Sequence, residues 1–343
     1  MGAFDFVKIF RVNKSISIDL GTANILIYDK QRKKIVLNEP SVVARDRKTG
    51  KLIAVGREAR EMLGKTPDSI QAIKPLQDGV IADIDSTKEM ITYFIHKIYG
   101  NSLFKPEVMI CVPIEVTSVE RKALFDAVKG AKKTYIIEEG RAAIIGSGVD
   151  ISQPEGSMVI DIGGGSTDIA ILSLDENIAS KSIRIAGNRF DEDIVRYVKR
   201  KYNLLIGDRT AEKIKKELGS ALKVQSPEVM EIKGRDLETG IPNTVEVNAN
   251  EIYEAIEDSL FQIVNSTKEV LEKCPPELAA DILDNGIVMT GGGSLIRNFI
   301  DMMEKEVGIK VFLSPNPLDS VVLGGGAAFD NKKLLRTLQM KEN

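Results

Sequence analysis

Two segments of the chain combine an acidic residue with a glycine turn and could together hold a phosphate chain and its cation. Asp19 precedes one turn and Asp161 precedes the other; the turns contain Gly21, Thr22, Ala23 and Asn24, and Gly163, Gly164, Gly165, Ser166 and Thr167. Glycine has no Cβ, so backbone N–H groups in such turns can approach phosphate oxygens closely. Carboxylates are hard oxygen ligands that suit Mg²⁺, mostly through bound water. A single Asp of this kind is better explained as a cap of its own turn. The matched pair favours a cation site.

A third glycine loop contains Gly291, Gly292, Gly293 and Ser294. Any one such loop is weak evidence for phosphate binding, because glycine loops are common. The chain has no GxxxxGK[ST] motif, which excludes a P-loop protein. The three loops therefore predict a phosphate site of another kind.

The two acidic turns belong to a longer internal repeat. Residues 15–28 (SISIDLGTANILIY) and 157–172 (SMVIDIGGGSTDIAIL) align with their acidic residues 142 positions apart. In each copy, two β-rich stretches flank the turn, and strand–helix units follow. Such a repeat indicates a duplicated fold. We therefore expect an α/β protein of two related lobes, each with a mixed, mainly parallel sheet flanked by helices, with two small inserted subdomains.

The elements that must position these turns can be placed from periodicity and capping signals. Strands are expected at 108–112, 135–137 and 286–290. One helix should begin at Ser86, with a capping box to Glu89, and end at Gly100. Another should be capped by Thr117 through Glu120, and a third should follow from Arg141. Further helices are expected at 57–63, 190–202, 210–222, 250–273 and 295–307.

Composition narrows the class of protein. The chain has 343 residues, 47 basic and 50 acidic, so its net charge of -3 gives no global reason to expect nucleic-acid binding. Cys111 and Cys274 are too isolated for a disulfide framework or a zinc site, which fits a reducing compartment. His96 is the sole histidine, and a Ser-His-Asp triad around it is improbable. No apolar run could span a bilayer and no signal peptide is evident. Phe6 breaks the myristoylation pattern. From the lack of a bilayer-spanning run and of a signal peptide, we expect an intracellular protein.

At this density of motifs the chain resembles the actin superfamily, and most closely its bacterial family, that of MreB. The resemblance covers roughly residues 15–335 and implies an actin-like fold with a nucleotide cleft between the two lobes. Its most specific segments are SIDLGTAN, LNEPSVVA, IKPLQDGVIAD, VPIEVTSVERKA, VIDIGGGSTDIA, SIRIAGNRFDEDI and GIVMTGGGSLIRN. On this basis the expected division is an amphipathic segment (1–13), subdomain IA (14–34, 80–150 and 320–343), IB (35–79), IIA (151–190 and 250–319) and IIB (191–249).

The resemblance implies roles for individual residues toward ATP and Mg²⁺. The turns after Asp19 and Asp161 match the family's two phosphate loops, and the loop 291–294 matches its adenosine loop. Glu139 matches the glutamate that positions the attacking water, which Thr167 could also contact. Glu212, Lys215 and Lys216 match ribose- and adenine-contacting positions. From the residues alone, a solvated helix face explains those last three better.

The chain departs from the family at the residue after Glu139. The family commonly has proline there, whereas this chain has Gly140, and the stretch from Asp126 to Glu139 is about two residues shorter than usual. Proline stiffens a turn and glycine loosens it. We therefore expect slow hydrolysis and retained ATP binding.

Two apolar segments raise the question of a membrane. Ala3, Phe6, Val7 and Phe10 share one helical face, with Lys8, Arg11 and Lys14 nearby. This segment could lie in the headgroup region of an anionic membrane or pack on the body of the protein. By resemblance, Leu103 and Phe104 match a protruding hydrophobic loop, although they could equally plug a core. Together the segments favour a bilayer contact made by many subunits at once.

The resemblance thus implies a filament-forming, weak ATPase. It would lie at the inner face of the cytoplasmic membrane, maintain cell shape and organise cell-wall synthesis. Its expected partners are further copies of itself, the anionic membrane surface, and membrane proteins of cell shape and wall synthesis, and no nucleic acid. The alternatives are an actin-fold small-molecule kinase and a nucleotide-binding scaffold with little hydrolysis. A DnaK-type chaperone is less favoured, because no peptide-binding segment follows.

Overall fold

The computed structural model describes residues 14–100, 105–114 and 116–339, and it divides into two compact units. Unit 1 comprises Met1–Val112, Val116–Glu138 and Val321–Asn343; unit 2 comprises Pro113–Glu115 and Glu139–Ser320. The chain therefore passes between the units four times. The finer division into four subdomains stays a prediction, and each unit is described by itself below.

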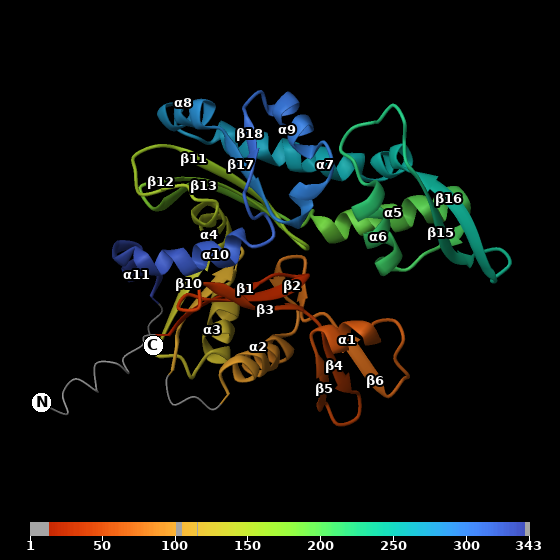
Figure 1. Ribbon diagram of the computed structural model, residues 1–343, viewed down its shortest axis with the longest axis horizontal. Coiled ribbons are helices and arrows are strands. Elements are labelled where there is room, and N and C mark those ends of the chain that lie inside the picture. The colour runs from red at the N-terminus through yellow and green to blue at the C-terminus, as the bar shows by residue number, and fades with distance from the viewer. Residues whose placement is uncertain (1–13, 101–104, 115, 340–343) are drawn as a thin grey trace, which may run out of the picture. The chain divides into compact units, whose positions relative to one another are not determined.

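Unit 1 is built on a five-stranded sheet of order β10-β9-β1-β2-β3 (Figure 1). The antiparallel strands β1 (Ser15–Leu20), β2 (Asn24–Asp29) and β3 (Lys34–Pro40) form a meander. Strands β9 (Glu107–Val112) and β10 (Lys133–Glu138) extend the sheet in parallel with β1. Helices α2 (Ile84–Tyr99) and α3 (Ser118–Ala127) contribute to its core, and α10 (Ser320–Ala327) and α11 (Lys332–Leu338) follow near the end of the chain.

The caps of the unit 1 helices correct one prediction and confirm another. Helix α2 begins at Ile84 rather than Ser86, because Asp83 is the N-cap and its carboxylate accepts the Ser86 N–H at 2.9 Å. An aspartate is a strong cap, and Ser86 lies inside the first turn as its donor. Thr117 and Glu120 form the predicted reciprocal capping box of α3.

A small insertion in unit 1 contains its own sheet, of order β5-β4-β6. Its strands are β4 (Val43–Asp46), β5 (Leu52–Val55) and β6 (Ile70–Ile73), and helix α1 (Arg57–Met62) packs on them. The core is a separate cluster of small side chains, Val42, Ala44, Ala54 and Ala59. The short pair β7 (Leu76–Gln77) and β8 (Val80–Ile81) leads back to the main sheet.

Unit 2 repeats the topology of unit 1. Its sheet has the order β13-β12-β11-β17-β18, formed by an antiparallel meander of β11 (Ser157–Ile162), β12 (Thr167–Ser173) and β13 (Glu176–Ile183). Strands β17 (Ile287–Thr290) and β18 (Val311–Leu313) extend it in parallel with β11. Each sheet is thus mixed, with as many antiparallel as parallel pairs. The duplication predicted from the sequence repeat is confirmed.

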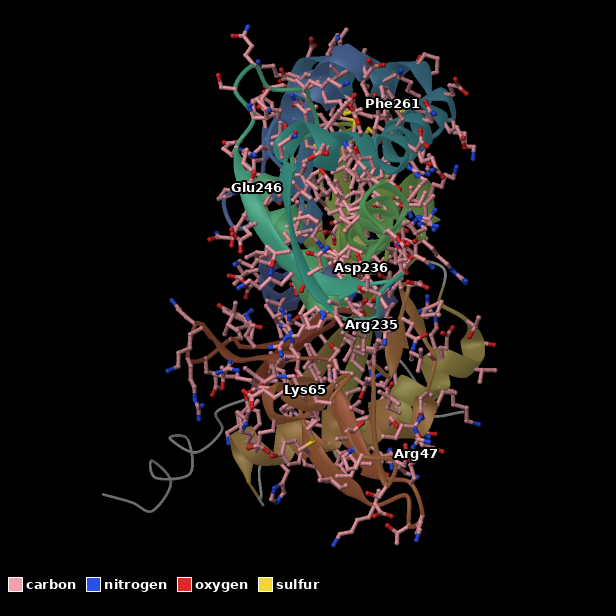
Figure 2. All side chains as sticks on the ribbon, turned by 90° about the vertical axis from the view of Figure 1, so that its right-hand side faces the viewer. Arg47, Lys65, Arg235, Asp236, Glu246 and Phe261 are labelled. Atoms are coloured by element: carbon pink, nitrogen blue, oxygen red, sulfur yellow. The ribbon has the colours of Figure 1, made fainter. Side chains whose placement is uncertain are left out.

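A three-stranded sheet of order β14-β15-β16 projects from unit 2. It consists of β14 (Leu204–Leu205) and the hairpin of β15 (Val229–Asp236) and β16 (Pro242–Asn248). Asp236 ends β15 and accepts the backbone N–H groups of Glu238 and Thr239, which forms the turn. Figure 2 labels Arg235 and Asp236 beside this turn and Glu246 on the returning strand.

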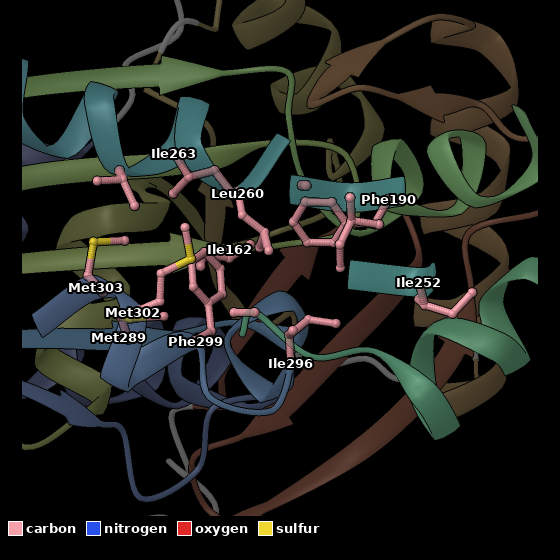
Figure 3. Close-up of a cluster of buried hydrophobic side chains, with 14 of the residues drawn as sticks. Ile162, Phe190, Ile252, Leu260, Ile263, Met289, Ile296, Phe299, Met302 and Met303 are labelled. Atoms are coloured by element: carbon pink, nitrogen blue, oxygen red, sulfur yellow. The ribbon is translucent and has the colours of Figure 1, made fainter. Parts of the chain in front are cut away.

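Five helices in the described part of unit 2 contribute to one large core (Figure 3). They are α5 (Gly187–Tyr202), α6 (Asp208–Leu218), α7 (Ala249–Glu272), α8 (Pro276–Asn285) and α9 (Phe299–Val307). Helix α4 (Glu139–Gly146) packs against β11 and β12. Ile162, at the end of β11, is buried in the same cluster as Phe190 of α5 and Phe299 of α9. Helix α9 begins later than predicted, because Gly292–Leu295 forms a 3-10 turn and Asn298 takes a left-handed φ of 60°. This core fixes the base of the β11–β12 turn.

Among the described residues, no helix has the length and apolar character needed to cross a bilayer.

Candidate functional site

The turn between β11 and β12 is held by the beginning of α5. The turn closes with a hydrogen bond from the Gly163 N–H to the Ser166 carbonyl at 2.9 Å. The N–H groups of Gly187 and Asn188 donate to the carbonyls of Gly163 and Gly164 at 3.1 and 2.8 Å. The N–H groups of Gly164 and Gly165, in contrast, have no acceptor among the described residues. Two fixed donors of this kind can bind a phosphate oxygen.

Lys215 of α6 holds Gly187, the first residue of α5, in place. Its Nζ donates to the Gly187 carbonyl at 2.7 Å and pairs with Asp191 at 2.9 Å. A Cβ at Gly187 would lie 3.3 Å from that Nζ and 3.4 Å from the Gly163 carbonyl oxygen, so glycine allows the close approach. The Lys215 side chain is 13% exposed. The structure thus places Lys215 under the phosphate turn, and its predicted contact with a nucleoside stays a prediction.

The two neighbours predicted alongside Lys215 lie differently. Glu212 and Lys216 form an i,i+4 ion pair at 2.6 Å on α6, with the Lys216 side chain 67% exposed. A pair this open to water contributes only a few tenths of a kcal/mol to stability. Sequence spacing had joined the three residues on one turn of helix. The structure separates Lys215 from the other two, whose role toward a nucleoside also stays a prediction.

Asp161 has a second carboxylate beside it that sequence reasoning missed. Asp161 of β11 lies directly opposite Asp168 of β12, and on its other side it is level with Thr290 of β17. Directly opposed residues of an antiparallel pair point to the same face, and like charges there repel. Both side chains are buried, and the Ile114 N–H approaches Asp168 at 3.5 Å. The signal was available in the sequence, since DIGGGSTD places an acid on each side of the turn.

This pair fits a hard cation held largely through water. Among the described residues there is no group of three or more His, Cys, Asp or Glu side chains that could hold a metal by themselves. Two carboxylates leave most positions of an octahedral Mg²⁺ to water and phosphate oxygens, which is the usual arrangement for this ion. Asp19 has the equivalent place in unit 1: like Asp161, it is the fifth residue of its strand. Joint use of Asp19 and Asp161 stays a prediction.

The third glycine loop packs directly on the end of β11. Gly291 has a φ of +81°, and a Cβ there would lie 2.3 Å from the Ile162 carbonyl oxygen and 2.5 Å from Asp161 Oδ1. A Cβ at Gly293 would lie 2.2 Å from Cγ2 of Ile162. Ser294 closes the loop by donating from Oγ to the Gly291 carbonyl at 2.6 Å. The structure therefore brings the second and third predicted loops together around Asp161.

The turn of unit 1 is held in a similar way. Ser41 donates from Oγ to the Gly21 carbonyl at 2.6 Å, and its N–H donates to the Ala23 carbonyl at 3.0 Å. Thr22 is buried, and its Oγ1 accepts the Gly79 N–H at 3.2 Å. Ala23 is exposed, and Asn24 begins β2. Again the carbonyls of the turn are occupied by neighbouring groups of the protein.

The predicted catalytic residues lie at the start of α4 and of β12. Glu139 is the first residue of α4 and is 9% exposed. Thr167 is fully buried and its Oγ1 donates to the Ile185 carbonyl at 2.6 Å, so toward a water this hydroxyl can only accept. Gly140 packs against β12: a Cβ there would be 3.2 Å from Cβ of Ala170. That crowding gives a physical reason for a residue without a side chain at this position.

The predicted membrane contacts, Phe6, Phe10, Leu103 and Phe104, lie outside the described residues.

Comparison with known proteins places this geometry in a family. Residues 13–337 match the family described as MreB/Mbl protein. The chain is 49% identical to the cell shape-determining protein Mbl of Bacillus subtilis over 321 residues, which is 93% of this chain and 96% of that protein. It is 47% identical to the cell shape-determining protein MreB of Escherichia coli over 326 residues, covering 93% and 94% of the two chains.

Solved structures agree with the fold. Crystal structures of MreB5 of Spiroplasma citri, bound to ADP and to AMPPNP, each superimpose with a TM-score of 0.88 at 38% identity, over 94% of this chain and 98% of theirs. The MamK double helical filament shares the fold at 21% identity, with a TM-score of 0.79 over 93% and 99% of the chains. The duplicated sheets are therefore those of an actin-like fold, and the chain belongs to the MreB/Mbl family of bacterial actins.

Proposed function

We propose that this chain is an ATP-binding, filament-forming cytoskeletal protein with weak ATPase activity. ATP binding favours head-to-tail contacts between copies, and hydrolysis weakens them. Heterologous contacts that do not close on themselves produce filaments. Such filaments lie on the inner face of the cytoplasmic membrane and organise cell-wall synthesis, with membrane proteins of that machinery as partners. The names of the relatives, cell shape-determining proteins, support this role.

The observation that supports nucleotide binding most directly is the phosphate turn of unit 2. Its carbonyls are engaged by the first N–H groups of α5, and the donors of Gly164 and Gly165 are left for an anion. Asp161 and Asp168 stand at the base of the same turn. The MreB5 relative has been crystallised with ADP and with AMPPNP, which are nucleotides of the expected kind. In this proposal the turn after Asp19 contributes further donors to the same phosphates.

Glu139 is the residue we propose to orient the attacking water. A carboxylate near the γ-phosphate can accept a proton from that water and align it for in-line attack. Asp161 and Asp168 would hold Mg²⁺ through water, and the ion would supply positive charge against the phosphates. Thr167 assists only as an acceptor, since its proton is donated to Ile185. Gly140 does not fix its own φ as proline would, and on that ground we propose slow turnover.

The test separates binding from turnover. Glu139→Gln keeps the shape of a side chain that is 9% exposed and removes only its charge. We expect unchanged ATP affinity and unchanged ATP-dependent pelleting, with phosphate release at least 10-fold slower, in the lower range for a lost general base. Glu155→Gln, in the exposed loop before β11, is the matched control and should behave as the wild type.

Unchanged phosphate release in Glu139→Gln would remove Glu139 from the mechanism. Wild-type protein that pellets with ATP but releases no phosphate would instead favour the non-hydrolysing scaffold, the alternative that Gly140 supports. Failure of the wild type to pellet with ATP would contradict the filament proposal.

A further inference from the structure

One end of the sheet in unit 1 is strongly basic. At this end β1, β9 and β10 begin, β2 ends and β3 begins, because β9 and β10 are parallel to β1 and β2 is antiparallel to both of its neighbours. A lysine stands within two residues of each of the five strand ends. We call the set the basic edge; it comprises Lys14, Lys30, Arg32, Lys33, Lys34, Lys105, Lys132 and Lys133.

Strand register places these residues in one row across the sheet. Ser15 is level with Glu107, and Glu107 is level with Lys133. On the other side, the Lys30 N–H donates to the Ser15 carbonyl at 3.0 Å, and Asp29 is level with Lys34. The edge therefore runs continuously across all five strands, about 20 Å at the usual strand spacing.

The local charge differs in sign from that of the whole chain. Within the described part of this edge, three carboxylates face the eight cations, each in an ion pair: Asp330 with Lys30, Glu107 with Lys132, and Asp29 with Arg32. Eight positive and three negative charges leave +5 at the edge, whereas the whole chain has a net charge of -3. At the opposite end of the same strands stand Asp19, Glu39 and Glu138. The sheet is thus electrically polarised from end to end.

Part of the basic edge is held in place by an aromatic side chain. Tyr99 donates from its hydroxyl to Asp29 at 2.9 Å. Lys14 Nζ and Arg32 Cζ lie 5.3 and 5.9 Å from the centre of its ring. Cations at this distance are attracted to an aromatic face. Tyr99 therefore keeps two of the eight cations at the edge and limits the conformational entropy lost when a partner binds.

We infer that the basic edge binds the anionic headgroups of a lipid bilayer and supplies the electrostatic part of membrane attachment. This inference rests on the proposed function and names residues for it that lie outside the apolar segments. Lys14 directly follows residues 1–13, which contain Phe6 and Phe10, and Lys105 directly follows Leu103 and Phe104. A row of cations is complementary in charge to an anionic surface.

The effect can be sized from the number of charges removed. Each Lys or Arg close to an anionic membrane strengthens binding by an amount that corresponds to about 5-fold in partitioning. The variant Lys33→Gln/Lys34→Gln/Lys105→Gln removes three exposed charges that make no ion pair among the described residues, and it leaves Tyr99 and its contacts intact. We expect about 100-fold weaker partitioning onto vesicles containing 30% phosphatidylserine, at low salt.

The experiment is vesicle flotation of the full-length chain without nucleotide, so that filament avidity does not multiply the effect. The matched control is Lys48→Gln/Lys199→Gln/Lys305→Gln, which removes three exposed lysines that do not belong to the basic edge. It should partition like the wild type, and all three proteins should bind neutral phosphatidylcholine vesicles equally. Raising salt from about 0.05 to 0.5 M should weaken the wild type far more than the edge variant.

Equal loss in the edge variant and the control, or no loss in the edge variant, would overturn the inference. So would an edge variant that loses binding to duplex DNA while keeping its binding to phosphatidylserine, since the partner would then be a nucleic acid. Thermal melting checks that each variant is folded. Polymerisation is measured separately by pelleting with ATP in the absence of lipid. Failure in that assay contradicts the proposed function, whereas failure only in flotation contradicts the basic edge.

Discussion

Lys215 gives the sharpest test of the site, because a neighbouring lysine on the same helix serves as its control. The substitution is Lys215→Met, which keeps the apolar stem and removes the ammonium group. That group makes two hydrogen bonds, to the Gly187 carbonyl at 2.7 Å and to Asp191 at 2.9 Å. Both side chains of the ion pair are nearly buried, at 13% and 14% exposure. Removing one partner of a buried pair leaves the other charge without its main compensation.

The expected cost follows from that burial. Breaking a fully buried pair costs about 3–5 kcal/mol. Because both side chains retain slight exposure, we take the lower end and expect Lys215→Met to lower the free energy of unfolding by about 3 kcal/mol. Lys216→Met removes an even closer ion pair, with Glu212 at 2.6 Å, but the Lys216 side chain is 67% exposed. It should cost no more than about 0.5 kcal/mol.

The assays are equilibrium urea unfolding and binding of a fluorescent ATP analogue. Without the Lys215 ammonium, the Gly187 carbonyl loses its hydrogen-bond donor. The start of α5, whose N–H groups hold the phosphate turn, is then fixed less firmly. We therefore expect Lys215→Met to bind ATP at least 10-fold more weakly, about 1.4 kcal/mol, and Lys216→Met to bind it nearly as well as the wild type. Equal losses of stability in the two variants would refute the argument from burial. A loss of ATP affinity confined to Lys216→Met would refute the positioning role of Lys215.

Two further outcomes test other parts of unit 2. Gly293→Ala should lower the free energy of unfolding by about 1–3 kcal/mol, because its Cβ would lie 2.2 Å from Cγ2 of Ile162. In the control Gly292→Ala, the new Cβ meets only Leu318, at 3.4 Å. The control should therefore be nearly neutral in thermal melting. Burial opposes ionisation of Glu251, but hydrogen bonds from Lys201, Tyr202 and the Asn248 N–H outweigh it and lower its pKa. Because the folded pKa lies below the unfolded value of about 4.3, the stabilisation is complete above that value and is lost as the pH falls through the folded pKa. Glu251→Gln should therefore be less stable at pH 7 and lose less stability than the wild type between about pH 5 and 3 in urea titrations; parallel curves would contradict the assignment.

Sequence patterns predicted those elements whose signals are local. The β1–β2 and β11–β12 hairpins follow from alternating apolar residues around a glycine turn, and the capping box of Thr117 and Glu120 is formed as expected. The start of α2 differs from the prediction, because Asp83 rather than Ser86 is the N-cap. The start of α9 was misplaced because Gly292–Leu295 satisfies its backbone in a 3-10 turn instead.

The composition of the site was also readable from the sequence. Two Asp–Gly turns 142 residues apart indicated the duplication, and the sheets of both units have the same strand order. Such a repeat is visible because each copy forms the same tight turn with close backbone approach. Only a few residue types, glycine above all, can occupy such a turn.

Only tertiary structure decided which of those residues meet and what each one contacts. The sequence by itself determined that Asp161, Gly291 and Lys215 were candidates. Packing of Gly291 on Asp161, the pairing of Asp161 with Asp168, and the burial of Lys215 beneath Gly187 depend on contacts between segments far apart in the chain. Local spacing cannot distinguish a lysine that faces solvent from one that faces a neighbouring helix, because both have the same helical period. Burial, which sets the strength of an ion pair, exists only once the chain has folded.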